Sequence, residues 1–265
     1  MSLIVMHELS SRADDVHNAM PRIRRHLIPI SHHSTRSAKN NNIMSRIRHF
    51  ARDVYANALY GWGASRLERI PAGKLLILTL HRILPLQLRD QYPLPGLAVT
   101  PDELRWVLAC VARHFVVDTV SGALDRLRNG SSDKPLLAVS FDDGQLDNLE
   151  FGLPILEEFD IKASFYLPTD YIGGDHLLWH DAAAFAWQQL TQNISATHEF
   201  VREFRLVEPV GEQRTPDVES FLAALKRLSV ARRAEILAAL ASRCPATPPE
   251  WARLMNWEEA GQLYR

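Results

Sequence analysis

The chain has 265 residues, 46% of them hydrophobic, which is long and apolar enough to bury a sizeable core. Its 30 Lys and Arg residues against 31 Asp and Glu residues leave a net charge of −1, so no overall electrostatic argument for nucleic-acid binding holds. Two cysteines are too few for a disulfide framework or a thiolate zinc site. We expect no transmembrane segment, because no apolar run approaches the roughly 20 residues that a membrane span needs.

The amino-terminal part differs in composition from the rest. Residues 1–43 are rich in Ser, Asn, Arg and His without a sustained hydrophobic period, which predicts a disordered tail. Residues 44–70 are predicted to form an N-terminal helical segment, with Met44 as the functional start. Three arginines within 44–60 allow weak contact with an anionic membrane surface, although packing of this helix on its own domain is favoured. No secretory signal is visible, so the location stays open between cytoplasm and cell envelope.

From residue 71 onward, short apolar runs alternate with amphipathic segments. We expect residues 71–265 to belong to one domain. The apolar runs predict strands at 75–80, 115–117, 136–141, 163–167 and 200–207. The amphipathic segments predict helices at 101–111, 121–128, 149–159, 181–190, 216–228, 230–242 and 257–264. The Thr-Pro-Asp-Glu sequence at 100–103 is a capping box for the first helix. Alternation of this kind predicts an α/β fold with a parallel sheet or barrel.

The most informative segment joins the predicted strand at 136–141 to Asp142, Asp143 and Gly144. Parallel sheets and barrels place their chemistry at this carboxyl end of the strands. Neighbouring side chains on a strand point to opposite faces, but Gly144 permits dihedrals that turn both carboxylates toward one cavity. Two close carboxylates repel one another unless a cation compensates, so the pair indicates a metal. The alternative is a solvated Asp-Asp-Gly turn without chemistry.

The surrounding residues resemble the polysaccharide deacetylases of the NodB-homology family (carbohydrate esterase 4-like). The resemblance is carried by Ser140-Phe141-Asp142-Asp143-Gly144, Asp147-Asn148, Leu153-Pro154-Ile155-Leu156, Ala163-Ser164-Phe165-Tyr166-Leu167, Leu80-His81-Arg82-Ile83-Leu84-Pro85, Tyr171-Ile172-Gly173-Gly174 and Leu178-Trp179. It extends from about residue 75 to residue 265. The Phe-Asp-Asp-Gly core with its neighbours in this order is a specific signal.

The resemblance implies a distorted (β/α) barrel and metal-dependent hydrolysis of acetyl groups on N-acetylated carbohydrate, a reaction at non-peptide carbon–nitrogen bonds. By position, Asp142 matches the general base of the family and Asp143 a ligand of a divalent metal, usually zinc. We expect His81, which closes the strand at 75–80, to line the cavity and contact substrate, with a structural role in the following turn as the alternative. Trp179 is the candidate sugar platform. The expected partner is an acetylated carbohydrate or polysaccharide.

The sequence departs from the family pattern in its metal ligands. The family supplies two further donors from a His-Ser/Thr-x-x-x-His or similar motif, which normally follows a segment like that at 254–263 and has no counterpart before Arg265. A catalytic zinc site needs about three protein ligands and an open position. We therefore expect a partial barrel lacking its C-terminal half, an incomplete metal site and little or no activity. His176, His180 and His198 match none of the family's ligands, and we expect them to be surface or core residues.

Two other classes of function remain open at this stage. A degenerate, non-catalytic carbohydrate-binding protein would keep the site without turnover. A phosphotransferase of the haloacid-dehalogenase type also places Asp at the end of an apolar strand. That class needs Asp-x-Asp, whereas Asp142 and Asp143 are adjacent, which makes it the weaker alternative.

Overall fold

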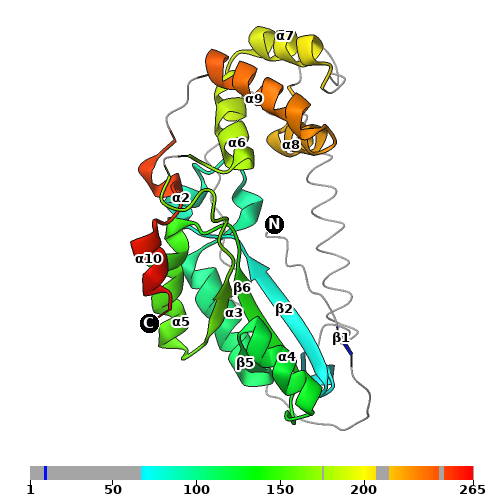
Figure 1. Ribbon diagram of the computed structural model, residues 1–265, viewed down its shortest axis with the longest axis vertical. Coiled ribbons are helices and arrows are strands. Elements are labelled where there is room, and N and C mark those ends of the chain that lie inside the picture. The colour runs from blue at the N-terminus through cyan, green and yellow to red at the C-terminus, as the bar shows by residue number, and fades with distance from the viewer. Residues whose placement is uncertain (1–8, 11–66, 175, 207–214, 245–247, 265) are drawn as a thin grey trace, which may run out of the picture.

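The computed structural model describes residues 9–10, 67–174, 176–206, 215–244 and 248–264 (Figure 1). The predicted tail at 1–43 and helical segment at 44–70 fall outside these ranges except for residues 9–10 and 67–70. Within the described part, no helix combines the length and the apolar character that a membrane span requires.

A mainly parallel sheet forms the lower half of the molecule in Figure 1. Its strands are β1 (Leu9–Ser10), β2 (Lys74–Leu80), β5 (Val116–Asp118), β6 (Leu136–Phe141) and β7 (Ala163–Phe165). β2 pairs with β6 in parallel along its length, from Leu75 opposite Leu136 to Leu80 opposite Phe141. β5 and β7 pair in parallel with successive halves of β6, and β1 pairs antiparallel with β2. The predicted α/β class and parallel sheet are confirmed, but the described strands do not close into a barrel.

Strand β6 is buried along its whole length because helices cover both faces of the sheet. One face packs on α3 (Pro101–His114) and α5 (Leu153–Glu158) through alternate residues such as Leu137 and Val139. The other face packs on α4 (Val120–Asn129) through Leu136 and Ala138. The nearly continuous apolar run at 136–141 is therefore explained by burial on both sides.

The helix boundaries follow local capping chemistry. Thr100 accepts a hydrogen bond from the Glu103 amide and Glu103 accepts one from the Thr100 amide, so the predicted capping box is confirmed. The segment predicted as a helix at 149–159 starts instead as a π-helix, η3 (Asn148–Gly152), before α5 begins. Pro154 has no N–H to donate to the preceding turn, which accounts for the irregular start.

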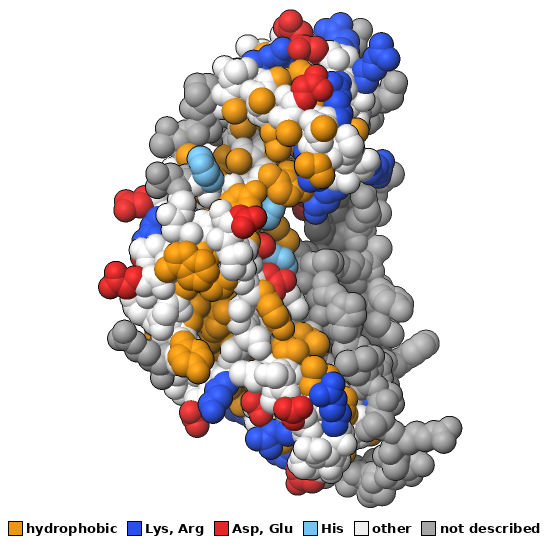
Figure 2. All heavy atoms as spheres, in the orientation of Figure 1, with side chains coloured by type: hydrophobic (Ala, Val, Ile, Leu, Met, Phe, Trp, Pro, Cys, Tyr) orange, Lys and Arg blue, Asp and Glu red, His pale blue; other side chains and the backbone are white. Residues whose placement is uncertain are grey.

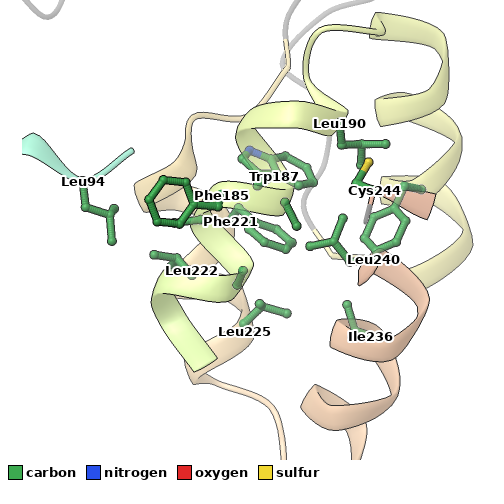
Figure 3. Close-up of a cluster of buried hydrophobic side chains, with 14 of the residues drawn as sticks. Leu94, Phe185, Trp187, Leu190, Phe221, Leu222, Leu225, Ile236, Leu240 and Cys244 are labelled. Atoms are coloured by element: carbon green, nitrogen blue, oxygen red, sulfur yellow. The ribbon is translucent and has the colours of Figure 1, made fainter. Parts of the chain in front are cut away.

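A helical part lies above the sheet in Figure 1. It contains α6 (Trp179–Leu190), α7 (Ile194–Phe204), α8 (Val218–Lys226) and α9 (Val230–Arg243). Trp187 is its central side chain, stacked on Phe221 with ring centroids 4.0 Å apart (Figure 3). The predicted helical pair at 216–228 and 230–242 is confirmed by α8 and α9.

The strand predicted at 200–207 is wrong, because residues up to Phe204 belong to helix α7. Phe200, Val201 and Phe204 are buried together, a spacing that fits one face of a helix. Asn193 caps the start of this helix by accepting a hydrogen bond from the Ala196 amide. The Asn193 cap and the helical spacing of the buried residues are therefore a better guide to the structure here than the apolar residues at 200–207.

Shorter elements connect these parts. They are η1 (Leu67–Arg69), β3 (Arg82–Ile83), α2 (Leu86–Arg89), η2 (Pro95–Leu97), β4 (Ala98–Val99), η4 (Glu250–Ala252) and α10 (Trp257–Gln262). β3 and β4 pair in parallel as a separate two-stranded sheet. Because β3 directly follows β2, this small sheet lies next to the carboxyl end of the main one.

Candidate active site at the carboxyl end of strand β6

The chain makes a tight turn where β6 ends. Asp143 and Gly144 both adopt positive φ angles, 74° and 62°, in the left-handed region that Asp tolerates and Gly favours. This turn ends the alternation of the strand, and the side chains of Asp142 and Asp143 are both only partly exposed. Backbone hydrogen bonds fix the turn: the Asp142 amide donates to the Leu80 carbonyl at 3.0 Å, and the Met255 amide donates to the Gly144 carbonyl at 2.9 Å.

Replacing Gly144 by Ala is expected to lower the free energy of unfolding by about 1–2 kcal/mol, the usual cost of a left-handed non-glycine residue. Steric conflict adds to that cost, because a Cβ at this position would lie 2.9 Å from Ile172 Cδ1. Urea unfolding followed by circular dichroism measures the change. Gly261→Ala is the matched control, since that helical glycine has open space around it and Ala favours the helix. Equal effects at the two positions would contradict the expected strain.

The Asp142 carboxyl has a raised pKa. Burial is the main cause, and the neighbouring Asp143 carboxylate adds to it, while His81 acts in the opposite direction. His81 follows β2 and thus stands beside Asp142 at the same edge of the sheet, as predicted from the sequence. An acid with a raised pKa retains its proton longer and is a stronger base once it is ionised.

Because the pKa of Asp142 is higher in the folded than in the unfolded protein, its ionisation destabilises the fold as pH rises. Asp142→Asn is therefore expected to raise the free energy of unfolding at pH 7, and this gain should shrink as pH is lowered toward about 4. Urea unfolding at several pH values measures the difference. Asp170→Asn, the same substitution at an exposed position, is the matched control. A gain that grows toward low pH would refute the raised pKa.

Helix α6 brings a histidine to the carboxylate pair. His180 Nε2 lies 3.9 Å from Asp143 Oδ2 and 3.7 Å from Asp181 Oδ1. The sequence predicts that His180 is a surface or core residue, whereas the structure places it beside Asp143, the predicted metal ligand. The signal that was available is its position next to Trp179, the candidate sugar platform.

Trp179 begins helix α6 and is partly buried against the helical core. The guanidinium carbon of Arg233 lies 4.5 Å from the centroid of the indole ring. A sugar ring that stacked on this face of Trp179 would therefore displace Arg233. Among the other histidines, His176 is exposed and His198 lies on helix α7.

Beneath the turn lies a buried charged network that sequence reasoning missed. Asp147 accepts hydrogen bonds at 2.8 Å from Arg82 Nε and from the Ile83 amide, and it also forms an ion pair with Arg82 Nη2. Arg82 and Asp147 are almost fully buried. Burial raises the pKa of the Asp147 carboxyl, and the Arg82 guanidinium works against that shift.

Asp181 is the second acid of this network and is also fully buried. Its Oδ1 accepts a hydrogen bond from the Tyr92 hydroxyl at 2.6 Å, and its Oδ2 accepts one from Gln145 Nε2 at 3.3 Å. Arg82 Nη1 lies 3.6 Å from the same Oδ2. The network thus joins β3, the turn after β6 and the start of α6. The isolated Asp and Tyr positions give no sequence signal, because their partners lie tens of residues away.

The donors present do not fit a complete catalytic metal site. Asp143 and His180 are near enough to share a cation, but the described residues contain no group of three or more His, Cys, Asp or Glu side chains arranged to hold one. A catalytic zinc ion takes about three protein ligands. The predicted role of Asp143 as a metal ligand therefore stays a prediction.

One face of the molecule is hollowed between the helical part and the sheet, and acidic and histidine side chains gather there (Figure 2). The fold and site together define a mixed α/β protein with a carboxylate pair at the carboxyl end of a parallel sheet. Such a position is where α/β proteins bind ligands.

No family model matches the chain, and no curated protein matches it. Three solved structures are similar at low identity. A de-N-acetylase from Aggregatibacter actinomycetemcomitans is 16% identical over 43% of this chain and 51% of its own, with a TM-score of 0.30. IcaB from Ammonifex degensii is 16% identical over 63% and 80%, with a TM-score of 0.32. The deacetylase PplD from Streptococcus pyogenes, in complex with acetate, is 15% identical over 63% and 79%, with a TM-score of 0.31.

The chain spans about half the length of the first of these structures. Two of the three are deacetylases by name.

Proposed function

We propose that this chain is a protein of the polysaccharide deacetylase type that binds acetylated carbohydrate at the turn after β6. The observation that carries the proposal is the pair of partly buried carboxylates, Asp142 and Asp143, at the carboxyl end of a central parallel strand. The resemblance of residues 140–144 to the deacetylase motif supports it. The reaction class would be hydrolysis of an acetyl amide, a non-peptide carbon–nitrogen bond. A partial (β/α) barrel belongs to the same proposal.

Asp142 is the proposed general base. Its raised pKa suits a group that removes a proton from an attacking water. His81 stands beside it as the proposed contact to substrate, and Trp179 is the proposed sugar platform. Asp143 is proposed as a ligand of a divalent metal, with zinc as the first candidate. The described residues do not supply the further donors that such a site needs.

A non-catalytic variant of the same function is the second candidate. The observation that favours it is the two-donor arrangement of Asp143 and His180 where three ligands are needed. Such a protein would bind the sugar and release little or no acetate. The two candidates share the binding site and differ only in turnover.

The test combines binding and turnover on N-acetylated chitooligosaccharides. We expect saturable binding by calorimetry and little or no acetate release, with or without added zinc or cobalt. Trp179→Ala should weaken binding about tenfold, equivalent to about 1.4 kcal/mol, because it removes the stacking surface. Trp106→Ala is the matched control on an exposed Trp of helix α3 and should leave binding unchanged.

Each outcome has a defined meaning. Absence of binding would refute the proposed function. Robust acetate release that Asp142→Asn abolishes would confirm the deacetylase class and refute the expected inactivity. Release that Asp142→Asn leaves intact would remove Asp142 as the base.

A further inference from the structure

The buried network under the site has features that packing alone does not explain. Arg82 carries one positive charge between two buried acids, Asp147 and Asp181. Burying charges costs several kcal/mol each, and well-packed apolar residues often stabilise a fold equally well. A network of this kind is therefore weak evidence for stability. We therefore ask which residues of the candidate site the network holds in position.

Asp181 links this network to the candidate site. It directly follows His180 at the start of α6, and its Oδ1 lies 3.7 Å from His180 Nε2. Its two oxygens accept hydrogen bonds from Tyr92, in the segment after α2, and from Gln145, in the turn after β6. Gln145 directly follows Gly144, so the hydrogen bond from Gln145 to Asp181 joins α6 to the carboxylate turn.

We propose that Asp181 and Tyr92 are positioning residues that hold His180 against Asp143. The Tyr92 hydroxyl fixes one oxygen of Asp181, Gln145 fixes the other, and the fixed carboxylate sets the first turn of α6. His180 then faces Asp143 at 3.9 Å and becomes a member of the site. The inference rests on the proposed function only for the importance of that site.

The test measures the reactivity of each histidine with diethyl pyrocarbonate, mapped by mass spectrometry. All proteins are labelled at the same pH, and the rate at each histidine is compared between the variants. In the unaltered protein His180 should react more slowly than the exposed His176. Tyr92→Phe and Asp181→Asn should each raise the rate at His180 at least threefold and leave His114, at the end of α3, unchanged.

Tyr166→Phe is the matched control, because that tyrosine is 51% exposed and lies outside the network. Tyr92→Phe removes one hydroxyl and should fold, so it decides the outcome if Asp181→Asn does not fold. An unchanged rate at His180 in folded Tyr92→Phe protein would overturn the proposal, as would equal rates at His180 and His176 in the unaltered chain. None of these rates depends on sugar binding or turnover, so failure of the proposed function would be recognised separately.

Discussion

Asp147→Asn is expected to lower the free energy of unfolding by about 3–5 kcal/mol, the range for removing one partner of a buried ion pair. The amide has the size of the carboxylate but carries no charge, and its nitrogen is a hydrogen-bond donor. It therefore cannot replace the carboxylate as the ionic partner of Arg82 Nε and Nη2. Arg82 would then remain buried with Asp181 as its nearest acid, at 3.6 Å. Urea unfolding at pH 7 measures the loss.

Glu203→Gln is the matched control for this variant. Glu203 pairs with Arg243 between helices α7 and α9, and both side chains are more than one-third exposed. An exposed pair of this kind contributes about 0–1 kcal/mol. If the two variants lose equal stability, the buried Arg82–Asp147 pair contributes no more to the stability of the fold than an exposed pair does.

Trp187→Ala is expected to lower the free energy of unfolding by about 3–5 kcal/mol, as for other large-to-small changes of buried aromatic residues. Trp187 is 1% exposed, stacks on Phe221 and donates a hydrogen bond from its indole N–H to the Pro216 carbonyl at 3.1 Å. Its removal opens a cavity between α6, α8 and the segment before α8. The carbonyl also loses its donor.

Trp106→Ala is the control because it deletes the same side chain from helix α3, where 73% of it is exposed. Its effect should stay within about 0.5 kcal/mol. Thermal unfolding followed by circular dichroism compares the two. A small loss for Trp187→Ala would mean that α6 is not held by the core drawn in Figure 3.

The elements that were predicted well are those with a local cause. The strand at 136–141 follows from its apolar run, and helix α3 follows from the capping box at Thr100. Helix α7 was missed because the strand preference of Phe200 and Val201 was given more weight than the Asn193 cap and the helical spacing of the buried residues. The irregular start of α5 was not predicted. We attribute it to Pro154, which lacks an N–H group, and the spacing of apolar residues carries no information about hydrogen bonds.

The residues of the candidate site also fall into those with a local signal in the sequence and those without one. The sequence predicts the placement of Asp142, Asp143 and His81 at one edge of the sheet, because parallel strands bring their ends together. Their roles stay predictions. His180 and the Arg82 network were not predicted, because they depend on where helix α6 lies relative to the sheet. Tyr92 and Asp181 are 89 positions apart, and no local pattern reports such a contact.

Part of the support for the carboxylate turn comes from late in the chain. The Met255 amide bonds to the Gly144 carbonyl, and Arg82 Nη2 bonds to the Trp251 carbonyl, 169 positions further on. Contacts between such distant positions form slowly, since a large loop must close first. During synthesis on the ribosome, Asp142 and Asp143 would consequently emerge long before residues 251–255, which stabilise their turn. In refolding experiments the turn should therefore reach its final structure after the sheet has formed.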